Sequence, residues 1–130
     1  MFTIEQIQTA HSKVKSGADF PAYITDIKAL GVTHYEVNVS DGQINYHGVN
    51  NYTVIVPAKY ESLPIANIAK GEEFKAALID HQQGKSDFLT FIKLCATFGI
   101  VKWIICMDKM TCTYYDNVGS VILMEEIPQK

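Results

Sequence analysis

Apolar residues recur at helical spacing twice within the first 30 residues. Thr3 and Gln6 form the sequence of a capping box ahead of the first stripe. The second stripe follows Asp19, has a proline in its first turn, and ends at Gly31, the residue type that favours a left-handed helix end. The pattern therefore predicts two helices, with a break at Ser16-Gly17. The two apolar stripes are Ile4, Ile7, Ala10, His11 and Val14, then Phe20, Tyr23, Ile24, Ile27 and Leu30.

Alternating apolar and polar residues then predict three antiparallel strands, at 32–39, 43–48 and 52–56. The Asp41-Gly42 pair between the first two favours a two-residue hairpin turn. That turn would place Val37 opposite Tyr46, and Glu36 opposite His47.

The same order of elements recurs 68 residues later, where Asp87 matches Asp19 and Gly99 matches Gly31. Helices are expected at 72–83 and 88–98, and strands at 100–107, 111–115 and 120–126. We therefore expect an α+β fold of internally duplicated helix-helix-three-strand units, with antiparallel meanders and helices packed around one core. Residues 1–130 would form a single domain of two pseudo-repeats, about 1–57 and 70–127. The connector between them allows a short helix at 65–68.

The predicted first hairpin places His34, Glu36 and His47 on one outer face of the sheet. Two imidazoles and a carboxylate could bind a divalent metal, or pair a general base with the group that orients it. The alternative is a solvated face on which these side chains form only weak surface pairs. No established metal or catalytic spacing accompanies the cluster, so the sequence predicts no cofactor and no assured catalytic or metal-binding residue.

Three tyrosines are candidates for a ligand-binding pocket. They are Tyr46 in the first half, and Tyr114 and Tyr115 in the second. Their rings and hydroxyls could line such a pocket, or they could be residues at the rim of the core whose hydroxyls contact water.

The outer faces of the two halves differ in polarity. Lys102, Ile104 and Tyr115 take the places of His34, Glu36 and His47 in the second half. The apolar character of 101–107 on both faces suggests a strand that is covered on both sides. The cover could be a partner, such as a second copy of the chain, or the C-terminal residues or connector of the same chain.

Composition excludes several classes of function. All the basic residues are scattered lysines, and the net charge is −3, which argues against sequence-specific nucleic-acid binding. No apolar run approaches the roughly 20 residues of a membrane span, and we expect no secretory signal. Cys95, Cys106 and Cys112 lack a CxxC spacing, which suggests reduced thiols in a cytoplasmic protein.

Several segments resemble the YdfO-like family of uncharacterised bacterial and prophage proteins, often labelled "phage envelope protein". The resemblance is carried by 1–4, 17–23, 30–35, 39–42, 81–85 and 109–116. It implies a compact bacterial, cytosolic α+β protein, and it supplies no catalytic residues.

From the sequence we expect a small cytoplasmic, non-enzymatic binding or interaction module that self-associates as a homodimer. It would act through a sheet face or the groove between its halves, on a protein or small-molecule partner that the sequence does not identify. The alternative is a small metal-dependent or His/Glu-based hydrolase that uses His34, Glu36 and His47.

Overall fold

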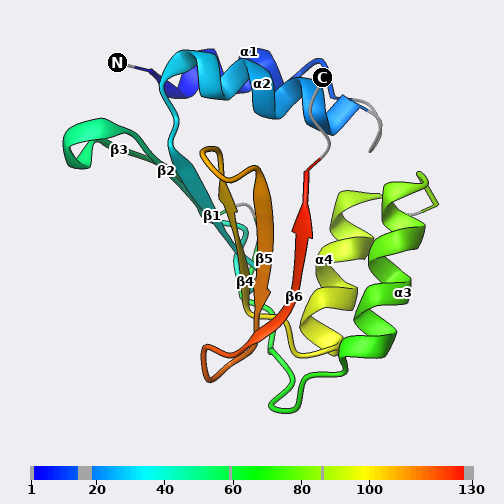
Figure 1. Ribbon diagram of the computed structural model, residues 1–130. Helices are drawn as coiled ribbons and strands as arrows, with labels where there is room; N and C mark the ends of the chain where they lie inside the picture. Colours follow the sequence, from blue (N-terminus) through cyan, green and yellow to red (C-terminus); the bar gives the residue numbers. More distant parts are fainter. Residues whose placement is uncertain (1, 15–18, 59, 86, 128–130) are drawn as a thin grey trace.

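The computed structural model describes residues 2–14, 19–58, 60–85 and 87–127, with only the backbone of residue 88 (Figure 1). The first half contains α1 (Ile4–His11), α2 (Phe20–Leu30), β1 (His34–Asn38), β2 (Ile44–His47), a 3₁₀ turn (Val49–Asn51) and β3 (Thr53–Val56). The second contains α3 (Gly71–Gln82), α4 (Phe88–Thr97), β4 (Lys102–Cys106), β5 (Thr111–Tyr115) and β6 (Val121–Glu126). The predicted helix break at Ser16-Gly17 and the predicted packing of Phe88 lie outside the described residues.

The six strands form one antiparallel sheet in the order β3-β2-β1-β4-β5-β6. The two halves meet at β1 and β4, which pair along their whole length. In Figure 1 the pair α1 and α2 crosses one end of the sheet, and α3 and α4 stand beside β6. The α+β class is confirmed, whereas an origin by duplication stays a prediction.

In β1, β2, β4 and β5, side chains alternate between a buried inner face and an outer face that is half-buried or exposed. The inner face carries large apolar and aromatic residues: Tyr35, Val37, Ile44, Tyr46, Trp103, Ile105, Cys112 and Tyr114. These residues and the buried faces of the helices form one hydrophobic cluster that includes both halves. The helices therefore pack on the inner face, as their apolar stripes predict.

The helix ends predicted at Thr3, Gly31 and Asp87 are confirmed, whereas α1 ends at His11, earlier than predicted. Thr3 and Gln6 form both hydrogen bonds of the capping box, at 2.9 and 3.2 Å. The Asp87 carboxylate accepts a hydrogen bond of 2.7 Å from the Thr90 N–H at the start of α4. Gly31 ends α2 in the left-handed region, with φ of 108°.

The predicted two-residue hairpin turn is wrong. Residues 39–43 connect β1 to β2, and His34 pairs directly with His47. The Asp41 carboxylate accepts a hydrogen bond of 2.9 Å from the Gln43 N–H, and Gly42 takes a positive φ of 79°, which stabilises a wider loop. The register therefore moves by two residues, and an even shift keeps every side chain on its predicted face.

The short helix allowed at 65–68 is absent from the structure, where this part of the connector is irregular. Its backbone donors are used elsewhere: Ala66 N–H donates to the Ala96 carbonyl and Lys70 N–H to the Phe98 carbonyl. These bonds satisfy carbonyls at the C-terminal end of α4, which have no partner within that helix. The connector thus caps α4 instead of forming its own helical turn.

Candidate functional site

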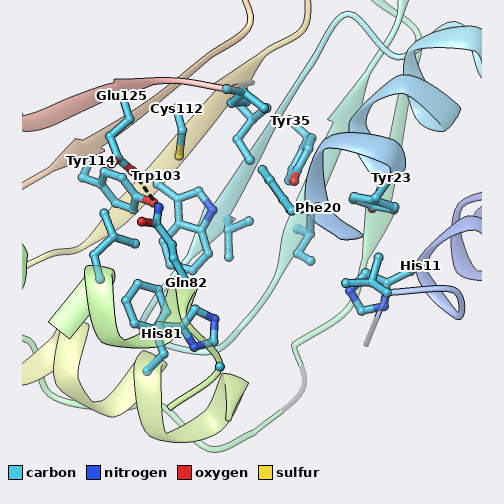
Figure 2. A pocket seen from close by; sticks show the side chains of 18 of the residues that line it. His11, Phe20, Tyr23, Tyr35, His81, Gln82, Trp103, Cys112, Tyr114 and Glu125 are labelled. Carbon is cyan, nitrogen blue, oxygen red and sulfur yellow. Dashed lines mark hydrogen bonds between the residues drawn. The ribbon is translucent and has the colours of Figure 1, made fainter. Parts of the chain in front are cut away.

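A cavity of about 760 Å³ lies on the inner face of the sheet, between the first and second helix pairs. We call it the central cavity. Figure 2 shows side chains from the sheet and from helices of both halves around it. Its volume lies in the range of small-molecule sites, and most of its lining is apolar or aromatic. This makes the central cavity the strongest candidate for a functional site among the described residues.

Tyrosine hydroxyls mark the first-half side of the central cavity. Tyr23 comes from α2, Tyr35 from β1 and Tyr46 from β2. The hydroxyls of Tyr23 and Tyr46 lie 3.0 Å apart, and the rings of Tyr35 and Tyr46 are 4.9 Å apart. Burial, as the largest cause, raises the pKa of all three phenols above the ordinary value. They are therefore neutral at pH 7, and they offer hydrogen bonds instead of negative charge.

The second-half side is formed mainly by aromatic rings without such a cluster of hydroxyls. Trp103 of β4 lies 5.9 Å from Phe91 of α4 and 5.8 Å from Tyr114 of β5, measured between ring centroids. Phe74 of α3 packs behind Tyr114 at 4.8 Å. This side of the central cavity presents ring faces and edges to a bound molecule.

A histidine lies at the last turn of one helix in each pair. His11 of α1 packs edge-to-face against Tyr23 at 5.3 Å. His81 of α3 stacks on Phe91 with ring centroids 4.3 Å apart and planes inclined by 8°. Both imidazoles line the central cavity and are fixed against an aromatic neighbour.

A carboxylate also reaches the central cavity from the inner face of the edge strand β6. Glu125 pairs in register with Cys112 of β5, and its Oε1 accepts a hydrogen bond of 3.1 Å from Gln82 Nε2 (Figure 2). The ion pairs among the described residues join Lys102 to Glu36 and Lys85 to Asp80, and neither includes Glu125.

The thiol of Cys112 also lines the central cavity but is a poor nucleophile. Burial, opposed in part by a hydrogen bond with Tyr114 and increased by the charge of Glu125, raises the pKa of Cys112 to about 12. Only the thiolate attacks efficiently, and a thiol of this pKa is protonated at pH 7. The raised pKa values of the tyrosines exclude them as ready bases for the same reason. Cys112 and these tyrosines therefore supply no activated nucleophile or base at pH 7.

The three predicted pocket tyrosines divide between the two faces of the sheet. Tyr46 and Tyr114 point inward and line the central cavity. Tyr115 points outward because it follows Tyr114 directly in the strand, and Lys102 Nζ lies 5.6 Å from its ring centroid.

His34, Glu36 and His47 share the outer face, away from the central cavity. The imidazoles of His34 and His47 stack with centroids 4.4 Å apart and planes inclined by 12°. Glu36 instead forms an ion pair of 3.0 Å with Lys102. No group of three or more histidine, cysteine, aspartate or glutamate side chains in the described part of the chain has the arrangement of a metal site.

Sequence reasoning missed most of the residues that line the central cavity. It placed Tyr23 in the apolar stripe of the second helix, and it gave no role to Glu125. The 68-residue offset links Tyr23 to Phe91 and Tyr46 to Tyr114. Matched aromatic residues are equally typical of a packed core, so this pattern does not separate a cavity wall from the core.

A family model described as "Protein of unknown function (DUF1398)" matches residues 8–126 and so covers most of the chain. No curated protein matches the chain. Within the described residues, the helices are too short or too polar to cross a membrane.

Proposed function

The chain belongs to the DUF1398 family, whose function is unknown, and we propose that it binds a small molecule in the central cavity. The observation that carries the proposal is the cavity itself. About 760 Å³ of space, partly open to solvent, lies among aromatic and apolar side chains. Concave, mostly apolar sites of this size are typical of small-molecule binding. A ligand that fills this space would bury the apolar surface that lines it.

Ligand binding fits Cys112 and the tyrosines better than nucleophilic catalysis does. Cys112 and the tyrosines have raised pKa values and are neutral at pH 7. They can orient a ligand by hydrogen bonding while the rings supply contact area. This proposal gives a specific location to the predicted binding module, which is the space between its two halves.

The experiment uses dansyl amide, a neutral fluorophore that accepts excitation energy from tryptophan. Trp103 is the only tryptophan of the chain and lies in the cavity wall. We expect saturable energy transfer from Trp103 to the dye. A cavity-filling Ile105→Phe variant should reduce it, whereas Ile104→Phe on the outer face of the same strand should not.

A wild-type protein that shows no saturable transfer, and no change in melting temperature with the dye, would contradict the proposal. Equal loss of binding in both phenylalanine variants would also contradict it, provided that both still unfold cooperatively. The wild-type measurement decides the matter if Ile105→Phe does not fold.

We propose, separately, that the chain self-associates through the outer face of its second half. Val121 and Met124 support this because their side chains are 58% and 61% exposed on the edge strand β6. Exposed apolar residues beside an unpaired strand edge favour association. Sedimentation should then show a species near twice 14.5 kDa, and a monomer at high concentration would contradict the idea.

The hydrolase alternative has less support. Glu36 is engaged by Lys102, and the two stacked imidazoles need a further ligand or a base partner to act. Failure to bind zinc at micromolar concentration would remove this alternative. A cytoplasmic location, the YdfO-like assignment and an association with prophages also stay predictions.

A further inference from the structure

We infer that the ligand of the central cavity is an organic cation, an amine whose ammonium group lies against Glu125 and whose apolar body packs on Trp103 and Phe91. The inference rests on the proposed function, because it concerns the ligand class of the same cavity. It depends on the position of one carboxylate, on the rings around it and on the charge of the lining.

Glu125 is the carboxylate that the fold directs to the inner face. Register places it opposite Cys112, whereas the next residue, Glu126, pairs with Thr111 on the outer side and is exposed. The negative charge of Glu125 acts on Tyr114 in the cavity wall. Burial is the largest cause of the raised pKa of Tyr114, Cys112 is the next, and Glu125 raises this pKa further.

Gln82 supplies one hydrogen bond to Glu125 but no positive charge. A carboxylate at an aromatic wall is stabilised most by a cation that both forms a charged hydrogen bond and displaces water. Neither ion pair among the described residues includes Glu125, so neither lysine in them supplies this cation. A bound amine would supply it.

The rings beside Glu125 favour the same class of ligand. Trp103 and Tyr114 lie 5.8 Å apart, and Phe91 extends the aromatic surface from Trp103 to His81. Ring faces attract ammonium groups and exclude water from them, with tryptophan the strongest partner. The same surface offers area to the apolar part of an amine.

Among the described lining residues, carboxylates outnumber lysines. The lining includes the carboxylates of Asp87, Glu125 and Glu126 and the ammonium group of Lys85. Lys85 is paired with Asp80 at 3.8 Å, and both side chains are mostly exposed. An anionic ligand would therefore meet repulsion at Glu125 without a strong compensating cation from the described lining.

Three ligands of nearly equal shape test the inference. They are 2-(1-naphthyl)ethylamine, 2-(1-naphthyl)ethanol and 1-naphthaleneacetate, which carry a positive, a neutral and a negative end group at pH 7. Calorimetric titration of the wild-type protein should give the tightest binding for the amine. The expected advantage over the alcohol is about tenfold, and the acid should bind least.

Two matched variants locate the effect. Glu125→Gln should weaken binding of the amine about tenfold and leave the alcohol within about twofold of wild type. Glu126→Gln removes the same charge one residue away, at an exposed residue paired with Thr111 on the outer side, and should weaken binding of the amine clearly less than Glu125→Gln does. Melting curves confirm that each variant is folded.

The outcomes separate the inference from the proposed function. Binding of the alcohol as tight as that of the amine overturns the cation and leaves a cavity for neutral ligands. An equal loss for both ligands in Glu125→Gln, or an equal effect of Glu126→Gln, overturns the role of Glu125. If none of the three ligands binds the wild-type protein and dansyl amide also fails, the proposed function itself is wrong. The wild-type order of affinities decides the case if Glu125→Gln is unfolded.

Discussion

The Tyr23 hydroxyl lies 3.0 Å from the Tyr46 hydroxyl, so a hydrogen bond joins helix α2 to strand β2 at the wall of the central cavity. Both rings are almost fully buried, with exposed fractions of 4% and 3%. The bond fixes the first helix pair over its half of the sheet. Both residues line the space in which we propose that the ligand lies.

Replacing either partner of this bond should reduce stability by about 1 kcal/mol, the usual net contribution of a buried hydrogen bond. Tyr23→Phe, Tyr46→Phe and the double variant keep the rings and remove only oxygen atoms. Because the two hydroxyls serve one bond, the double variant should lose less than the sum of the single losses. Urea unfolding of the four proteins measures this coupling, and strictly additive losses would show that the two hydroxyls act independently.

The stacked pair His34 and His47 should make the protein less stable in mild acid. Burial and then the charge of His47 lower the pKa of His34, while Glu36 opposes them. The unfolded chain therefore binds the His34 proton more readily than the folded chain does. Stability should be full above the ordinary histidine pKa of about 6.5, and it should fall as the pH drops below that value.

Urea unfolding at pH 7.5 and pH 5.5 tests this dependence. A His34→Gln variant should lose less stability between the two pH values than wild type does. A proton NMR titration that gives His34 an ordinary or raised pKa would contradict the expectation.

Cys112 should resist alkylation in the folded protein. Burial raises its pKa to about 12, so only about one thiol in 10⁴ is ionised at pH 8. Iodoacetamide followed by mass spectrometry should show slow labelling of Cys112 in buffer and ready labelling in urea. Rapid labelling of the folded protein would reveal an activated thiol and would reopen the case for nucleophilic chemistry.

Gly99 and Gly119 should respond differently to alanine. Both have positive φ, of 82° and 86°, which costs alanine about 1–2 kcal/mol. At Gly99 an added Cβ would also lie 2.7 Å from Ala69 Cα and 2.8 Å from the Ile68 carbonyl oxygen, whereas at Gly119 it would meet no described atom within 4 Å. Gly99→Ala should therefore lose about 2–5 kcal/mol, and Gly119→Ala only the conformational part. Equal losses in urea unfolding would show that the connector moves aside.

The repeated pattern of caps and strands predicted most of the fold because each signal is local. Thr3 with Gln6 and Asp87 with Thr90 act within one helical turn, and alternation alone placed Tyr46 and Tyr114 on the inner face. The pairing of β1 with β4 depends on residues about 70 positions apart, which no local pattern encodes. The wide turn at Asp41 was missed because Asp-Gly suits more than one loop length.

The candidate site was harder to predict than the fold. His34, Glu36 and His47 suggested a site because their side chains could bind a metal or act as a base. A polar outer face also brings such residues together when they have no chemical role. Trp103 and Tyr35 are indistinguishable from core residues in sequence, because a cavity wall and a packed core use the same side chains. The central cavity is formed by the sheet and both helix pairs together, so it is a property of the assembled structure.

The indole N–H of Trp103 provides the most direct test of ligand binding in the central cavity. The chain has one tryptophan, so the indole region of a ¹⁵N-labelled sample contains a single resonance. Titration with 2-(1-naphthyl)ethylamine should shift this resonance saturably, since the ring forms part of the cavity wall. An indole resonance that does not move at saturating amine and alcohol, while the protein remains folded, would contradict the proposal that the cavity binds small molecules.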